Sequence, residues 1–170
     1  VSEEKNKLVL NYDCVKLCLM VTVTLSLSEN SNVIVQENRV KNYGSMPKLL
    51  TSFSSSFIGG IAEGEKAFYD KDIIFNICGS KWQAEGQWHK YDADTLGLIP
   101  ATTHYWEQTH YDIRSVGSWS TGSGYYPCVI VEDRTDNRVW YMETEGSHSW
   151  MMRISSYGDY NSCTLALEAT

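Results

Sequence analysis

Short runs of alternating apolar and hydroxyl residues recur along the chain. The clearest run, residues 21–28, places Val or Leu at every second position with Thr or Ser between them. A period of two puts one set of side chains on each face of a β-strand, so this run predicts a half-buried strand. Residues 29–32 favour a turn, and residues 33–40 continue as the second strand of a hairpin.

A second hairpin is predicted further along the chain. Residues 128–132 and 139–143 are rich in β-branched and aromatic side chains, and they flank the polar stretch 133–138. This pattern is typical of two strands joined by a longer loop. The remaining predicted strands are residues 49–58, 73–77, 113–120, 149–154 and 164–167, with residues 82–88 continuing the sheet.

Helical signals are almost absent. One helical turn is expected at residues 92–98, capped by Asp92 or Asp94 and ended by Pro100. No amphipathic helix of ordinary length, internal repeat or linker interrupts the succession of short strands. This organisation predicts an all-β fold, a mainly antiparallel β-sandwich or barrel. We expect residues 1–170 to form a single β-sandwich domain, because a chain of this length buries one sizeable core.

Charge narrows the range of partners. The net charge is −7 and the isoelectric point is about 5.0. A negative surface repels phosphate backbones and anionic lipid, so we expect neither nucleic acid nor membrane as a partner. A neutral sugar is unaffected by that repulsion. The longest apolar run, residues 14–27, is interrupted by Lys16 and lacks the features of a bilayer span or a signal peptide.

The residues with reactive side chains show no metal or redox motif. The five cysteines are scattered without a C-x-x-C pair, which favours buried free thiols in a cytoplasmic protein. His104 and His110 lie six positions apart without a third ligand, so no metal or cofactor is expected. The cysteines are Cys14, Cys18, Cys78, Cys128 and Cys163.

No catalytic residue is assigned from the sequence. A G-x-S-x-G elbow and a glycine-rich phosphate loop are both absent. Glycoside hydrolysis needs two carboxyl groups about 5–9 Å apart, and spacing along the chain does not select such a pair. The acids considered, for which a solvated surface position is the simpler interpretation, are Asp92, Asp94, Glu132, Asp133, Glu143 and Glu145.

The six tryptophans offer two interpretations. An indole can stack on the C–H face of a sugar ring, and it can also fill the core of a sandwich. Trp140 and Trp150 lie in predicted strands, which favours the core. Trp106 lies with Tyr105 and Tyr111 in a stretch without periodicity, so these three residues are the candidates for sugar contact.

Several stretches together resemble glycoside hydrolase family 36, and their order and spacing agree with that family over most of the chain. Residues 21–24, 32–35 and 39–44 resemble its strand, turn and strand ending in N-x-G, and residues 49–50 and 52–56 its next strand. Residues 82–88 resemble a W-Q-x-E-x-Q-W block, residues 115–122 a block around G-S-W-S-T-G, and residues 131–134, 140 and 145–150 a run ending in G-S-W-x-W-E.

The resemblance implies an N-terminal β-supersandwich of the galactose-mutarotase-like kind, followed by a (β/α)₈ barrel. In the family, that barrel carries an aspartate nucleophile and a second aspartate as acid/base, and the enzymes retain configuration. A barrel needs about 250 residues, so this chain cannot contain it. Residues 90–94, Lys-Tyr-Asp-Ala-Asp, mimic the K-W-D-x-N motif but lie between sandwich segments. Met151 and Met152 stand where the family often has an acidic residue.

Three hypotheses follow. Since the chain starts at Val1 and ends at Thr170 without a polar tail, we expect a fragment of a larger N-terminal domain. On the first hypothesis it is a non-catalytic domain of a retaining α-galactosidase that packs on the catalytic barrel and supports hydrolysis of terminal α-galactosides. On the second it is an independent carbohydrate-binding sandwich with Trp106 as the platform. On the third it is a structural domain that forms a homo-oligomer through an exposed edge or apolar face.

Overall fold

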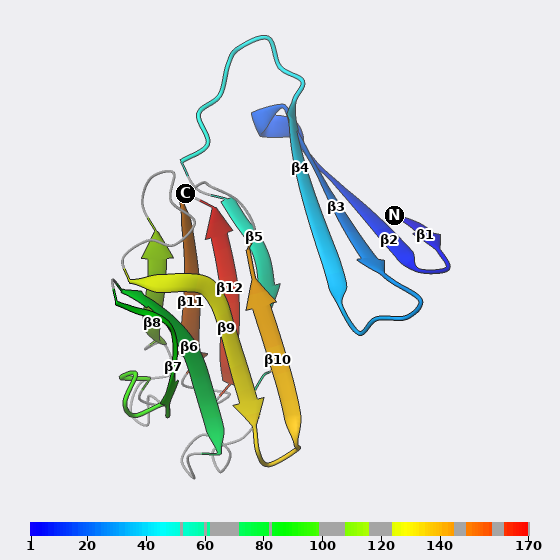
Figure 1. The fold of residues 1–170 in the computed structure, drawn as a ribbon. Helices are drawn as coiled ribbons and strands as arrows, with labels where there is room; N and C mark the ends of the chain where they lie inside the picture. The colour runs from blue at the N-terminus through cyan, green and yellow to red at the C-terminus, as the bar shows by residue number, and fades with distance from the viewer. Residues whose placement is uncertain are drawn as a thin grey trace. The chain divides into compact units, whose positions relative to one another are not determined.

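The fold is built from β-strands. The computed structural model describes residues 1–51, 53–59, 61, 72–81, 83–98, 108–115, 124–144, 149–157 and 162–169. Within these ranges twelve strands form three four-stranded sheets, and every strand pair is antiparallel. The all-β, antiparallel fold class expected from the sequence is therefore confirmed (Figure 1).

The chain divides into two compact units, Val1–Thr51 and Ser52–Thr170, and each is described by itself. The expectation of one domain over residues 1–170 stays a prediction. The first unit is a single sheet with the strand order β1-β2-β3-β4. Its elements are β1 (Ser2–Glu4), β2 (Lys7–Cys14), the 3₁₀ turn η1 (Val15–Leu17), β3 (Leu19–Leu27) and β4 (Ile34–Asn42).

The sheet of the first unit has an apolar and a polar face. Residues directly opposite one another on antiparallel strands share a face. The pairs Leu8↔Leu25 and Leu27↔Ile34 place apolar side chains on one face, and Ser26 opposite Val35 marks the other. Of the described residues in this unit, the only buried hydrophobic one is Leu19. The central apolar side chains of this face are half-buried, whereas Leu27 and Ile34 are 44% and 68% exposed.

The N-x-G passage of the resemblance forms a tight corner after β4. The Asn42 side-chain oxygen accepts a hydrogen bond from the Gly44 amide at 2.9 Å, and its amide nitrogen donates to the Met46 carbonyl at 2.8 Å. A Cβ at position 44 would lie 3.0 Å from the Cβ of Cys18, which is tighter than most contacts of real Cβ atoms. The close approach of the η1 turn therefore favours glycine there.

The second unit contains two sheets. Their strand orders are β10-β9-β6-β7 and β5-β12-β11-β8 (Figure 1). The strands are β5 (Phe53–Ile58), β6 (Ile73–Lys81), β7 (Ala84–Tyr91), β8 (Gln108–Ser115), β9 (Tyr125–Asp133), β10 (Arg138–Glu143), β11 (Trp150–Tyr157) and β12 (Ser162–Ala169).

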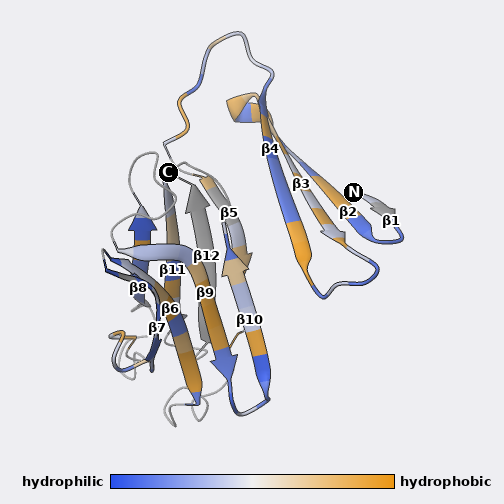
Figure 2. Cartoon of the chain, viewed as in Figure 1, coloured by the Kyte–Doolittle hydropathy of each residue, from blue (hydrophilic) through white to orange (hydrophobic). Residues whose placement is uncertain are grey.

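One hydrophobic core joins the two sheets of this unit, which makes it a sandwich. Phe75 on β6 and Val131 on β9 come from one sheet, and Ile113 on β8 with Trp150 on β11 come from the other. All four are at most 1% exposed. Orange segments on β6 and β9 mark these apolar runs in Figure 2. The predicted core position of Trp150 is confirmed, and Trp140 packs against the same cluster as predicted.

Several predicted boundaries shift. The strand expected at 73–77 continues to Lys81, and the one expected to start at 113 begins at Gln108. The strand expected from residue 49 begins at Phe53. The two extensions arise because backbone pairing with a neighbour continues a strand through polar residues that break the apolar pattern. The turn expected at 92–98 is present, and Asp92 caps it by accepting from the Thr95 amide at 2.8 Å.

Candidate functional site

The predicted sugar-contact residues are only partly visible in the structure. Tyr105 and Trp106 lie outside the described residues. Tyr111 lies on β8, where its ring packs against the core and its hydroxyl is 3.2 Å from the hydroxyl of Tyr125 on β9. Burial, followed by the hydrogen bond with Tyr125, raises the pKa of the Tyr111 phenol well above its usual value. Tyr111 thus links the two sheets of the sandwich, and its role in sugar contact stays a prediction.

Two of the candidate acids, Glu132 and Asp133, have structural partners. Asp133 closes the β9–β10 hairpin by accepting from the amides of Thr135 at 2.9 Å and Asp136 at 3.3 Å. Glu132 accepts from the Asn76 side-chain amide at 2.9 Å and lies 3.4 Å from the Lys90 ammonium. The hydrogen bond from Asn76, followed by Lys90, lowers the pKa of Glu132. A carboxylate held in this way is suited to stabilising the sheet rather than to donating a proton.

The described cysteines are free, as predicted. Cys78 is buried, Cys18 and Cys128 are half-buried, and Cys14 is exposed. Exposure of Cys14, at the end of β2, corrects the expectation that the thiols are buried. Among the described residues, no group of three His, Cys, Asp or Glu side chains is arranged to hold a metal ion.

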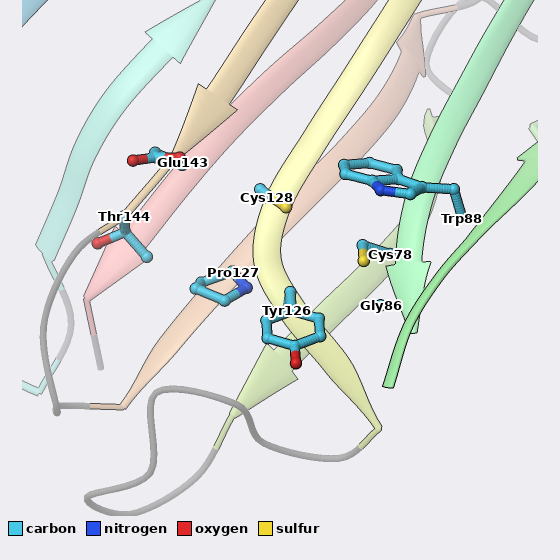
Figure 3. Close-up of a pocket in the computed structure, with 8 residues that line it drawn as sticks. All are labelled: Cys78, Gly86, Trp88, Tyr126, Pro127, Cys128, Glu143 and Thr144. Atoms are coloured by element: carbon cyan, nitrogen blue, oxygen red, sulfur yellow. The ribbon is translucent and has the colours of Figure 1, made fainter. Parts of the chain in front are cut away.

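A groove lies on the face of the β10-β9-β6-β7 sheet that points away from the core. We call it the outer-face groove, and its volume is about 390 Å³. Ligand sites in proteins usually measure about 300–1,000 Å³, so this hollow has room for a small molecule. It is lined by Cys78, Gly86, Trp88, Tyr126, Pro127, Cys128, Glu143 and Thr144 (Figure 3).

A row of side chains crosses all four strands at the groove. Glu143 on β10 is opposite Cys128 on β9, and Cys78 on β6 is opposite Trp88 on β7. Neighbouring strands lie about 4.8 Å apart. Three such spacings separate β10 from β7, so the groove is about 14 Å long. Trp88 and Glu143 thus stand at opposite ends of one elongated hollow.

An irregularity in strand pairing creates the hollow. Ile77 pairs with Val129 and Gly79 pairs with Tyr125, so three residues of β9 stand opposite the single residue Cys78. Such a bulge bends the strand and redirects its side chains. The Pro127 carbonyl accepts a hydrogen bond from the Thr144 amide at 3.1 Å, which fixes the bulge against the end of β10. The floor of the groove is therefore positioned by backbone contacts.

The lining of the groove is mostly apolar and includes one carboxylate. Burial is the largest cause that raises the pKa of the Cys128 thiol to about 11, and the neighbouring Cys78 and Glu143 contribute in the same direction. Burial also raises the pKa of the Cys78 thiol. Both thiols are thus protonated at neutral pH, when they act as weakly polar surfaces. Among the described residues that line the groove there is no lysine or arginine, and the Glu143 carboxylate is the only charged group.

Sequence reasoning placed Trp88 among six tryptophans but did not single it out. Gly86, Trp88 and Lys90 alternate on one face of β7, and a tryptophan between a glycine and a lysine is a weak signal of an exposed position. Trp88 is indeed 48% exposed. The other lining residues come from strands far apart in the chain, so only the register of the sheet brings them together.

The described residues thus define two units, an antiparallel β-sandwich with a shallow outer-face groove and a separate four-stranded sheet. Comparison of the chain with known protein families, with curated proteins and with solved structures gives no match. Over the part of the chain that the structure describes, no helix is long and apolar enough to cross a bilayer.

Proposed function

We propose that the chain is a non-catalytic β-sandwich domain of an α-galactosidase-like hydrolase of family 36. On this proposal it supports the hydrolysis of terminal α-galactosides by a (β/α)₈ barrel that lies outside the 170 residues. The observation that carries the proposal is the succession of sequence blocks that resemble the family. In the structure, residues 21–24 and 39–44 fall on the β3–β4 hairpin and its corner, and residues 131–134 fall on the β9–β10 hairpin.

The partner expected on this proposal is the catalytic barrel. A four-stranded sheet with one apolar face gains stability when that face is covered by another layer. In the first unit, Leu27 and Ile34 are exposed on the apolar face. These residues are suited to packing against the barrel or against a second copy of the chain. Free thiols at Cys14, Cys18 and Cys128 support a cytoplasmic location for the protein.

The gene gives the sharpest test of this proposal. Codons that follow Thr170 in the native gene should encode eight strand–helix repeats over about 250 residues, with an aspartate in a K-W-D-x-N-type motif at a strand end. An immediate stop codon, or an unrelated sequence, would contradict the proposal.

An activity assay gives an independent test. Residues 1–170 alone should leave a chromogenic α-galactoside intact, because on this proposal the nucleophile lies on the barrel. The protein encoded by the complete gene, prepared in the same way, should release the chromophore. Turnover by the purified 170 residues that persists through successive purification steps would overturn the assignment of a non-catalytic role.

A further inference from the structure

The outer-face groove has the chemical features of a ligand site. One end offers the indole of Trp88, which is 48% exposed although its neighbour Cys78 is buried. Figure 3 shows this indole extending from β7 toward β9, over the side of the groove that Cys78 and Cys128 line. An exposed aromatic plane beside apolar walls favours a ligand with a flat apolar face.

The other end of the groove offers polar acceptors. Glu143, which carries a carboxylate, and Thr144 both line the cavity. A carboxylate accepts hydrogen bonds strongly and repels anions, so this end favours hydroxyl groups and disfavours phosphate, sulfate or carboxylate. The net charge of −7 acts in the same direction.

Size restricts the ligand further. A hollow of about 390 Å³ that extends across four strands is longer than a single sugar ring and accommodates two linked rings. Pyranose rings combine a flat C–H face with hydroxyl groups at the rim. They therefore match both ends of the groove at once, whereas an aliphatic chain offers no hydrogen-bond donor to Glu143.

We propose that the outer-face groove binds a short neutral oligosaccharide, with one sugar ring stacked on Trp88 and the hydroxyl groups of the next ring donating to Glu143. This site differs from the Trp106 platform of the sequence-based hypothesis. It also stands independently of the proposed α-galactosidase role, because it rests on the geometry of one sheet.

Binding is tested by titrating residues 1–170 with melibiose, lactose, maltose and cellobiose in a calorimeter. At least one of these disaccharides should bind with a dissociation constant in the millimolar range or below. The same sugars should protect Cys128 from N-ethylmaleimide, followed residue by residue by mass spectrometry. The rate at which N-ethylmaleimide alkylates Cys128 should fall by the factor 1 + [L]/Kd, where [L] is the sugar concentration, which is about tenfold at ten times Kd. The exposed Cys14 should react at an unchanged rate.

Three variants locate the site. Trp88→Ala should weaken binding about tenfold or more, which corresponds to about 1.4 kcal/mol, and Trp88→Phe should recover part of the affinity. Tyr141→Ala is the matched control, since Tyr141 is 53% exposed on the same face but does not line the groove. Circular dichroism checks that each variant is folded. If Trp88→Ala is unfolded, Glu143→Gln replaces it and should weaken binding in the same assay.

The outcomes separate the alternatives. Absence of binding to all four sugars would overturn the proposal, as would equal affinities of Trp88→Ala and Tyr141→Ala. If, without sugar, the protection of Cys128 rises with protein concentration, a second copy of the chain occupies the groove. That outcome would also overturn the proposal. Binding restricted to cellobiose or maltose would support the groove and count against an α-galactoside as its ligand. The gene sequence after Thr170 tests the α-galactosidase role separately.

Discussion

Arg153 on β11 and Asp112 on β8 lie opposite each other in the second sheet of the sandwich unit. The guanidinium donates two hydrogen bonds to the carboxylate, both of 2.8 Å, and both side chains are partly buried. Paired hydrogen bonds of this kind are stronger than neutral ones and define a fixed geometry. Arg138 and Asp136, by contrast, form an ion pair at 3.1 Å in which both side chains are at least half exposed.

The Arg153–Asp112 pair should make stability depend on pH. The hydrogen bond from Arg153 is the main cause that lowers the pKa of Asp112, and burial opposes it. A lowered pKa contributes stability above the ordinary carboxyl value, and this contribution is lost as the pH falls through the folded-state pKa. Asp112→Asn should therefore lower the free energy of unfolding by about 1–3 kcal/mol at neutral pH. At strongly acidic pH, the difference in this free energy between the variant and wild type should shrink.

Urea unfolding at a series of pH values measures this effect. Asp136→Asn is the control, since an exposed ion pair contributes less than about 1 kcal/mol. If the free energies of unfolding of wild type and Asp112→Asn differ by a constant amount across the acidic range, Asp112 does not stabilise the sheet through its charge.

Strands were predicted where the pattern of apolar residues and the turn-forming residues between the runs agree. The β9–β10 hairpin was recovered because two β-branched runs flank a polar turn, and Asp133 then pairs with Arg138. The β3–β4 hairpin was recovered for the same reason. Strands β1 and β2 were missed. In β2, Leu8, Val9 and Leu10 are consecutive apolar residues without alternation. Strand β2 pairs with β3 and β1 pairs with β2, and no local pattern reveals either pairing.

The sandwich core provides a prediction at the level of the element. Phe75 on β6 is fully buried between the two sheets, so Phe75→Ala should leave a cavity and cost about 3–5 kcal/mol. Val139 on β10 is 65% exposed, and Val139→Ala should cost less than about 1 kcal/mol. The midpoints of urea unfolding measure the effects of both substitutions. If Phe75→Ala does not fold, Ile77→Val should still show a loss of about 0.5–1.5 kcal/mol. Equal effects at the buried and exposed positions would contradict the assigned core.

At the scale of the whole molecule, the fold class could be predicted from the sequence but the candidate site could not. Alternation, turns and the scarcity of helical signals are local properties, and they were sufficient for an antiparallel sandwich. The groove depends on a bulge opposite Cys78 and on the register that aligns Trp88 with Glu143 across four strands. These are properties of long-range pairing, so single residues such as Trp88 carried no decisive signal.

The exposed apolar face of the first unit leads to a prediction about assembly. Leu27 and Ile34 pair on that face, and a chain that leaves such a surface in water should associate at high concentration. Sedimentation velocity should therefore show species larger than a monomer for residues 1–170. Ile34→Lys should shift the distribution toward monomer, because association would bury an unpaired ammonium group. Val35→Lys is the matched control, since Val35 is 57% exposed on the opposite, polar face. A purely monomeric wild-type chain, or an equal response to both substitutions, would show that this face does not drive association.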